Sequence, residues 1–364
     1  MIPVARPALK GREKELVADC VASGWVSSKG KYIPAFEEAF AAFVDVPGAV
    51  AASNGTTALH LALLAARVGP GDEVIVPSLT FIATANAVAH AGAKPVFVDS
   101  EERTWNIDAK EIEKAITKKT KAIIPVHLYG HPAGMSAIMR LARKHGLRVI
   151  EDAAEAHGAR YNDRMVGSIG DLGIFSFYGN KIITTGEGGM IVTDDEALAE
   201  KAKILRDHGM DNKRRYWHTV LGYNCRMTNM QAALGVAQMK IIDKVIEKKR
   251  ENARAYNQAL KGVRGIKLPP EAKWAKNVYW LYSILVDEAK FGMSAPALRD
   301  YLRQNNVETR ALFIPAHKQP IYNKKQVLPV AERLSATGIS LPSSANLKKN
   351  DIEKIVSCIK KARG

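Results

Sequence analysis

Short apolar runs rich in β-branched residues alternate with longer amphipathic stretches between residues 49 and 193. Several of the short runs are continuously apolar, as expected for strands that are covered on both faces. This alternation predicts βαβ units and therefore a mostly parallel or mixed sheet sandwiched between helices, with ligands bound at the carboxyl ends of the strands. The predicted strands are 49–52, 73–77, 95–98, 122–127, 148–151, 173–177 and 189–193.

The intervening stretches predict helices, because their apolar residues recur every three or four positions. One of them is opened by Asp108, with Glu111 three residues later in the pattern of a capping box. The other predicted helices of this part are 56–68, 83–91 and 135–145.

The rest of the chain predicts a smaller α+β unit after a polar loop at 207–226. A long helical pattern runs from 229 to 260, and its middle is a plausible hinge into the smaller lobe. A strand at 279–286, a helix capped by Ser294, a loop at 314–320 and a terminal helix from Asp351 follow. We therefore predict an N-terminal arm and large domain at 1–245 and a small C-terminal domain at 246–364. The arm, residues 1–36, contains a loop at 23–30 with the Gly, Ser and Trp content of a functional segment.

Composition narrows the class of protein. The 364 residues are 47% hydrophobic and 25% charged, which is ordinary for a globular chain. Apolar runs stay well short of the 18 residues that a membrane span requires, and the N-terminus lacks the apolar stretch of a secretory signal. The three cysteines are widely spaced and form no C-x-x-C motif, so the sequence predicts neither disulfides nor a metal site. We expect a soluble cytoplasmic protein with no membrane partner.

Charge is unevenly distributed along the chain. Residues 1–200 hold 21 basic and 24 acidic side chains, whereas residues 201–364 hold 32 and 13, so the net charges are −3 and +19. Such a skew fits a solvated helix face, nucleic-acid binding, or a field that attracts a polyanionic small substrate such as a nucleotide diphosphate. Charge alone leaves these three interpretations open.

Three motifs carry candidate chemistry. Gly55 and Thr56 open a strong helix directly after a strand, and such a helix start is either a phosphate site or simply a capped helix. Asp152 ends an apolar strand, where a carboxylate needs a cationic partner unless it only caps a helix. Lys181 follows a buried strand in a Gly-rich turn. A desolvated lysine there is a nucleophile toward carbonyls, whereas a solvated one is an ordinary surface residue.

These three motifs together meet the needs of pyridoxal 5′-phosphate. The helix start would hold the phosphate, Asp152 would keep the pyridine nitrogen protonated, and Lys181 would supply the Schiff base. Phe81, just after the second predicted strand, is placed to cover the ring, although a core position is the simpler interpretation for one phenylalanine.

Six segments, in order and at ordinary spacings, carry a resemblance to a known family. They are SNGTTALHLALLA, GDEVIVPSLTFIATANAV, PVHLYGHPAGM, VIEDAAEAHGA, FSFYGNKIITTGEGGM and GYNCRMTNMQAALG. On these segments the chain resembles the DegT and StrS type of nucleotide-sugar aminotransferase along nearly its whole length. The resemblance implies a fold of the aspartate-aminotransferase type (fold type I), with a large mixed-sheet α/β domain, a small C-terminal α+β domain and assembly as a homodimer.

The resemblance also implies roles for individual residues. Lys181 would be the catalytic lysine, which joins the cofactor and moves the proton between cofactor and substrate. The implied cofactor-binding residues are Gly55, Thr56, Phe81, Asp152, Glu155, Ser176, Lys181 and Asn224, the last of which would reach the phosphate of the neighbouring subunit. Weaker candidates for the sugar nucleotide, each with an alternative as a packed or solvated residue, are Trp25, Lys29, Arg226, Arg310 and His317.

Two positions bear on this resemblance. Many relatives have Gln where this chain has Glu155, near the hydroxyl of the pyridoxal ring, and a carboxylate there would repel a phenolate. We therefore expect Glu155 to be protonated, turned toward another donor, or displaced. Relatives that dehydrate sugars have His at the position of Lys181, so a lysine favours amino transfer.

The implied reaction moves an amino group from L-glutamate to the C4 ketone of a GDP-linked 4-keto-6-deoxymannose. The segment SGWVSSKGKYI, the form Asp-Ala-Ala-Glu-Ala, and residues 215–218 leading into 222–224 are similar to enzymes of that substrate. One alternative is a UDP- or dTDP-linked keto sugar. Another is a non-catalytic protein that uses its basic half on nucleic acid, although the motif of Lys181 and Asp152 disfavours a nucleic-acid partner.

Overall fold

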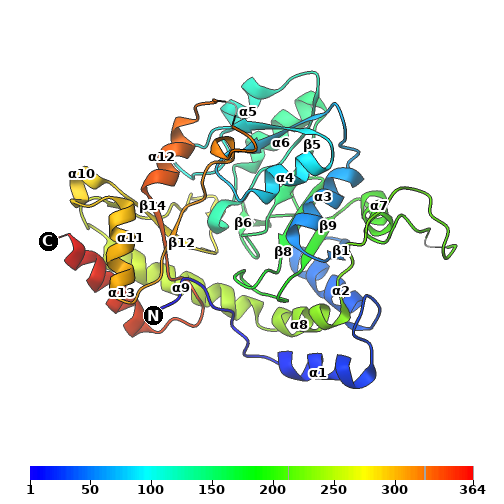
Figure 1. Ribbon diagram of the computed structural model, residues 1–364, viewed down its shortest axis with the longest axis horizontal. Coiled ribbons are helices and arrows are strands. Elements are labelled where there is room, and N and C mark those ends of the chain that lie inside the picture. The colour runs from blue at the N-terminus through cyan, green and yellow to red at the C-terminus, as the bar shows by residue number, and fades with distance from the viewer. Residues whose placement is uncertain (212, 324, 364) are drawn as a thin grey trace.

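The large unit is built on a seven-stranded sheet in the order β1–β9–β8–β5–β4–β2–β3 (Figure 1). The computed structural model describes residues 1–211, 213–323 and 325–363. β9 runs antiparallel to both of its neighbours, and the remaining pairs are parallel, so the predicted mixed sheet is confirmed. The strands are β1 (Gly48–Ala52), β2 (Glu73–Pro77), β3 (Lys94–Val98), β4 (Thr120–Ile123), β5 (Arg148–Asp152), β8 (Leu172–Ser176) and β9 (Gly189–Thr193).

Helices cover both faces of this sheet because successive strand residues point to opposite sides. Ile75 of β2 joins one apolar core with residues of α5 and α6, whereas its neighbours Val74 and Val76 join the core on the other face. α3 packs across β8 and β9 in that second layer, and α2 packs against β1 and α8. The helices of this unit are α1 (Glu13–Ser23), α2 (Tyr32–Val44), α3 (Gly55–Ala65), α4 (Ala83–His90), α5 (Ala109–Ala115), α6 (Met135–His145), α7 (Glu196–Arg206) and α8 (Asn229–Met239).

A smaller α+β unit has its own antiparallel sheet, in the order β10–β12–β14–β13, and its own apolar core. Its strands are β10 (Ile266–Lys267), β12 (Tyr282–Val286), β13 (Arg310–Ala311) and β14 (Gly338–Leu341). Its helices are α9 (Ile242–Leu260), α10 (Glu288–Phe291), α11 (Ala295–Gln304), α12 (Pro329–Thr337) and α13 (Lys349–Ala362). The predicted boundary between residues 245 and 246 falls within α9 and stays a prediction.

Short elements complete the connections. A three-stranded sheet of β11 (Ala275–Lys276), β6 (Arg160–Tyr161) and β7 (Arg164–Met165) ties the segment before β12 to the large unit. Two 3₁₀ turns, η1 (Leu128–Gly130) and η2 (Ala316–Lys318), follow β4 and β13.

The structure corrects several predicted boundaries. The pattern from 229 to 260 is two helices, because α8 ends at Met239 and α9 begins at Ile242. The strand predicted at 279–286 begins only at Tyr282, since Tyr279 has a left-handed φ of 48° that no strand accommodates. The arm is not irregular throughout: it contains α1 and the start of α2. The sequence of α1 lacks the regular spacing of apolar residues that predicts a helix, because only Glu13 and Cys20 of this helix are buried.

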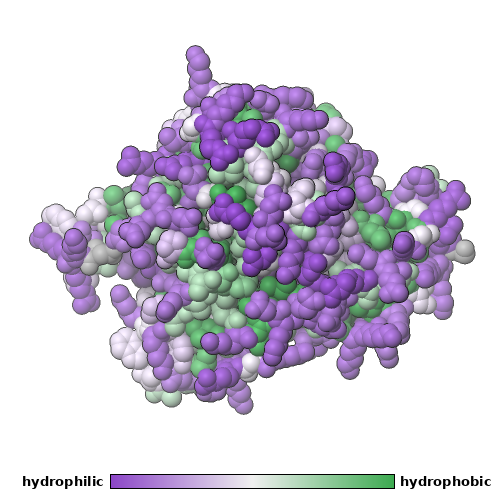
Figure 2. All heavy atoms as spheres, turned by 180° about the vertical axis from the view of Figure 1, so that it is seen from behind, coloured by the Kyte–Doolittle hydropathy of each residue, from purple (hydrophilic) through white to green (hydrophobic). Residues whose placement is uncertain are grey.

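Hydrophilic side chains cover most of the rear face, and hydrophobic residues come to the surface in patches near its middle (Figure 2). Within the residues that the structure describes, none of the helices has both the length and the apolar character to cross a membrane. The same residues contain no cluster of His, Cys, Asp and Glu side chains suited to a metal ion.

Candidate active site

A cavity of about 620 Å³ opens where the carboxyl ends of β2, β5 and β8 meet the start of α3. Its opposite wall comes from the smaller unit, through Trp280, Arg310 and Phe313. Most of the residues predicted for the site line this one cavity. They are Gly55, Thr56, Phe81, Asp152, Glu155, Ser176, Lys181 and Arg310.

The start of α3 is shaped to hold an anion. Asn54 caps the helix by accepting the N–H of Thr57 at 2.9 Å, and Thr57 closes the capping box in return. The first N–H groups of a helix have no intrahelical acceptor, so those of Gly55 and Thr56 are available to a phosphate. A Cβ on Gly55 would lie 2.8 Å from the Cβ of Ser176, so only glycine lets the Ser176 hydroxyl approach this helix start.

Asp152 is a buried carboxylate that accepts hydrogen bonds from the protein. Its Oδ2 accepts a hydrogen bond from Thr84 Oγ1 at 2.8 Å, and its Oδ1 accepts the N–H of Ala154 at 3.2 Å. Burial raises the pKa of Asp152 above its usual value, while these donors and the charge of Lys181 lower it. Across the described part of the chain, Asp152 forms no ion pair within 4.0 Å. A protonated ring nitrogen would supply the missing cation.

Lys181 lies in the turn that follows β8, where its N–H donates to Tyr178 O at 2.9 Å. Desolvation by the surrounding protein lowers the pKa of Lys181, and the carboxylates of Glu155 and Asp152 oppose this shift. An amine with a lowered pKa is more often neutral, and a neutral amine is the form that attacks carbonyl carbon.

Glu155 is turned toward a donor on the protein. Its Oε2 accepts the backbone N–H of Tyr129 at 2.8 Å, which is one of the three arrangements that the sequence left open. Burial raises the pKa of Glu155 to about 7, against the opposing effects of Lys181 and of the Tyr129 N–H. Glu155 therefore titrates near neutral pH.

Aromatic rings form one wall of the cavity. Tyr129 stacks on Phe313 with ring centroids 5.2 Å apart and on Trp280 at 6.3 Å, and the Phe313 N–H donates to the Tyr129 hydroxyl at 2.9 Å. Phe313 in turn contacts Phe81, whose side chain is 55% exposed and lines the cavity. Phe81 is thus free to lie against a planar ligand.

The other predicted site residues do not line the cavity of this chain. Asn224 and Lys29 are exposed, and Arg226 pairs with Asp207. The side chain of Trp25 is 57% exposed, and its carbonyl accepts Asn229 Nδ2 at 2.7 Å. Their roles in binding cofactor or substrate stay predictions.

His317 does not line the cavity either, and its role in substrate binding stays a prediction. It is buried, with Nδ1 at 2.6 Å from Ser78 Oγ and Nε2 at 3.1 Å from Glu332 Oε1. Both ring nitrogens therefore contact side chains of the protein.

Sequence reasoning missed four residues that shape the cavity: Thr84, Tyr129, Trp280 and Phe313. Thr84 follows Phe81 by three residues at the start of α4, so the helix period could have placed it near Phe81. The three aromatic residues come from loops far apart in the chain, and the sequence has no signal that brings them together.

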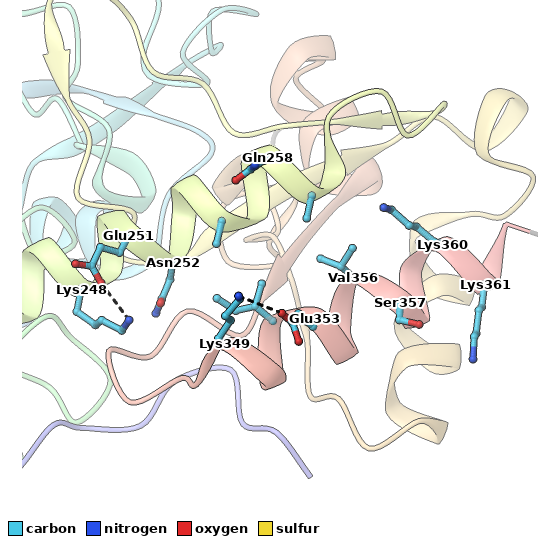
Figure 3. A pocket seen from close by; sticks show the side chains of 13 residues that line it. Lys248, Glu251, Asn252, Gln258, Lys349, Glu353, Val356, Ser357, Lys360 and Lys361 are labelled. Atoms are coloured by element: carbon cyan, nitrogen blue, oxygen red, sulfur yellow. Dashed lines mark hydrogen bonds and ion pairs between the residues drawn. The ribbon is translucent and has the colours of Figure 1, made fainter.

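A larger groove between α9 and α13 differs in character from this cavity (Figure 3). Lysine and glutamate side chains line it, and the pairs Lys248–Glu251 and Lys349–Glu353 neutralise one another. These side chains are solvated, and no buried carboxylate or amine converges on the groove. It therefore lacks the features of a catalytic site.

The comparison with protein families agrees with this geometry. Residues 7–360 match the model of the DegT/DnrJ/EryC1/StrS aminotransferase family. The chain belongs to this family. It is therefore an aminotransferase that depends on pyridoxal 5′-phosphate, with the fold type that the sequence implied.

Individual relatives are similar over their full length. The chain is 47% identical to the GDP-perosamine synthase of Escherichia coli O157:H7, with 98% of this chain and 97% of the relative covered. It is 46% identical to the GDP-perosamine synthase of Caulobacter vibrioides, with coverage of 98% and 97%. Among solved structures, DesV of S. venezuelae in complex with a ketimine intermediate matches with a TM-score of 0.91 at 36% identity, covering 97% of this chain and 94% of that one.

The described residues fit the cofactor of this family. The start of α3 suits the phosphate, the unpaired carboxylate of Asp152 suits a protonated ring nitrogen, and Lys181 suits the aldehyde carbon. Each group comes from a different element of the large unit, so only the assembled fold presents them together.

Proposed function

We propose that the protein transfers an amino group from L-glutamate to the C4 ketone of GDP-4-keto-6-deoxy-D-mannose, which yields GDP-perosamine and 2-oxoglutarate. The observation that carries this proposal is the similarity to two GDP-perosamine synthases at 46–47% identity over 98% of the chain. The product would be a precursor of a surface polysaccharide.

Within this proposal the cofactor-binding residues have distinct tasks. When bound, pyridoxal 5′-phosphate supplies an aldehyde and an electron-withdrawing ring. Gly55, Thr56 and Ser176 hold the phosphate, Phe81 lies against the ring, and Asp152 keeps the ring nitrogen protonated. Thr84 orients Asp152 through the hydrogen bond at 2.8 Å, so that the carboxylate keeps its direction while it bears charge.

Lys181 moves protons at the reacting carbon in both half reactions. It is suited to this task because its amine is desolvated and faces two carboxylates, Asp152 and Glu155. In each half reaction the same amine accepts a proton from one carbon and returns it to another, so it ends each half in the form in which it began. A lowered pKa brings the amine nearer to working pH, where acid–base catalysis is most effective.

We further propose that the working form is a homodimer whose subunits complete each other's sites. Asn224, Trp25, Lys29 and Arg226 lie outside the cavity of their own chain and would act on the cavity of the partner. The loop that carries Asn224 supports this idea, because it exposes large apolar side chains such as Trp217 at 51% and Leu221 at 86%. Arg310, which does line the cavity, would meet the anionic substrate within the same chain.

We infer a cytoplasmic location, since the cysteines Cys20, Cys225 and Cys358 are all free. Free thiols are typical of reducing compartments.

Product analysis tests the proposed function directly. The protein is incubated with L-glutamate and GDP-4-keto-6-deoxymannose, and in parallel with the UDP- and dTDP-linked 4-keto sugars, and the products are identified by mass spectrometry and NMR. We expect a GDP-linked 4-amino sugar and turnover at least tenfold slower with the other nucleotides. Preferred turnover of a UDP- or dTDP-linked sugar would overturn the assignment of the base while leaving amino transfer intact.

A further inference from the structure

Trp280 contacts Lys181 in two ways. The Lys181 Nζ lies 3.9 Å from the centroid of the Trp280 ring, well inside the range of a cation–π contact. The indole Nε1 donates to the carbonyl oxygen of Asn180, the residue before Lys181, at 2.8 Å. One side chain thus holds both the amine of Lys181 and the backbone that carries it.

The protein holds the indole in place from behind. Trp280 is 3% exposed, and its ring lies nearly parallel to that of Tyr129, with an interplanar angle of 16°. Val278 donates to Gly130 O at 3.2 Å, and a Cβ on Gly130 would lie 2.9 Å from the nitrogens of Tyr279 and Trp280. The segment before β12 is therefore pressed against the backbone of η1.

Backbone strain also sets the direction of Trp280. Tyr279 has a φ of 48°, a left-handed conformation that is unfavourable for an aromatic residue. Asn277 supports it, because its Oδ1 accepts the Tyr279 N–H at 2.7 Å. Strained residues of this kind persist where the surrounding structure requires them, often beside reacting groups.

The other charged groups around Lys181 do not replace this contact. Asp152 and Glu155 favour its protonated form, Arg310 disfavours it, and the buried ring of His157 is influenced by the same charge. Of the described residues, none has a carboxylate within ion-pair distance of the Lys181 amine. The indole face, with its centroid 3.9 Å from Nζ, stabilises an ammonium at this position.

We propose that Trp280 is a positioning residue. It holds the free Lys181 amine against its indole face by a cation–π contact, and it fixes the Asn180 carbonyl through a hydrogen bond from its indole N–H. This cation–π contact forms whenever Lys181 is not joined to the cofactor. Because the face of an indole attracts a cation, this contact favours the ammonium form of Lys181. This proposal rests on Lys181 as the cofactor lysine and is independent of the sugar that the enzyme uses.

The test measures the rate at which the full-length apoenzyme takes up pyridoxal 5′-phosphate, followed by absorbance, as a function of pH. The neutral amine of Lys181 reacts, so the midpoint of the profile reports its protonation. Trp280→Leu should move the midpoint to lower pH by about one unit, because the ammonium loses its cation–π partner. Trp280→Phe, which keeps a ring face, should move it less. Trp274→Leu removes a half-buried indole that packs on Tyr161 and His131 instead, and it should leave the midpoint unchanged.

A midpoint for Trp280→Leu equal to that of Trp274→Leu would overturn the proposal. Failure of the unsubstituted apoenzyme to take up the cofactor would overturn it together with the role of Lys181, whereas a wrong sugar assignment would leave the profile untouched. A thermal double-mutant cycle on the apoenzyme covers the case in which Trp280→Leu folds poorly. Trp280→Phe should then cost less stability in a Lys181→Met background than in the native one. Equal losses would contradict the proposed contact between Trp280 and the Lys181 amine.

Discussion

Thr84 Oγ1 donates a hydrogen bond of 2.8 Å to Asp152 Oδ2, although 68 residues separate the two in the chain. The bond joins the start of α4 to the end of β5, beneath the cavity. It stabilises the ionised form of a carboxylate whose burial alone would favour the neutral one. We expect this pair to determine how firmly the cofactor ring is held.

Asp152→Asn keeps the shape of the side chain and removes its charge. The asparagine still accepts the hydrogen bond from Thr84 but no longer keeps a ring nitrogen protonated, so kcat should fall roughly 10²-fold or more. Thr84→Val, which removes this donor together with the hydrogen bond between Thr84 Oγ1 and Thr80 Oγ1 at 3.0 Å, should have a smaller effect in the same direction. Steady-state kinetics and cofactor titration measure both. Full activity of Asp152→Asn would show that this carboxylate is not the partner of the ring.

Lys181→Ala should abolish nitrogen transfer from glutamate to the keto sugar, with a loss of roughly 10³-fold or more, because the same amine serves as nucleophile and as acid–base. Transfer of ¹⁵N from labelled glutamate gives a sensitive assay. Lys201→Ala is the matched control. Lys201 is another lysine whose pKa burial lowers, and its Nζ donates to Ala65 O at 3.1 Å, away from the cavity.

Gly55→Ala should weaken cofactor binding about tenfold, because its new methyl group would push Ser176 away from the start of α3, and the same crowding should lower stability by about 1–3 kcal/mol. Fluorescence titration of the apoenzyme measures the dissociation constant. Gly134→Ala places a methyl group where nothing lies within 4 Å, and it should bind the cofactor normally. Equal affinity of the two variants would argue against a phosphate at this helix start.

The stability of the apoenzyme should depend on pH because of Glu155. Its folded-state pKa of about 7 is above the ordinary value of 4.5, so the folded protein binds more protons than the unfolded chain between those pH values. Stability from this group is therefore greatest below about pH 4.5 and is lost as the pH rises through 7, by at most about 3 kcal/mol. Melting temperatures of Glu155→Gln should lack that slope. An unchanged slope would assign it to other groups.

Two inactive variants should complement each other if the subunits share their sites. Lys181→Ala and Asn224→Ala lose activity separately, but a mixed dimer contains one intact site, so random mixing should restore about a quarter of native activity. Activity is measured after the two proteins are mixed, dissociated and reassociated. No recovery, despite demonstrated exchange of subunits, would mean that Asn224 acts within its own chain or not at all.

Much of this protein could be predicted from its sequence because the deciding signals are local. Continuous apolar runs such as residues 74–77 of β2 are typical of a strand buried on both faces, and the carboxyl ends of such strands in a mostly parallel sheet share one edge. Asp152 ends such a run, and Phe81 and Lys181 come shortly after others, so the sequence pattern is sufficient to predict that they lie at a common edge.

Tertiary structure alone decided the features that depend on packing between distant segments. Trp280 reaches Lys181 only because Tyr279 adopts a left-handed backbone against Gly130, and no local pattern predicts that turn. His317 likewise lies between Ser78 and Glu332, which are 239 and 15 positions away in the sequence. Local periodicity determines which residues form strands and helices, whereas the partners of a side chain are chosen by the whole fold, where burial and hydrogen bonding are settled together.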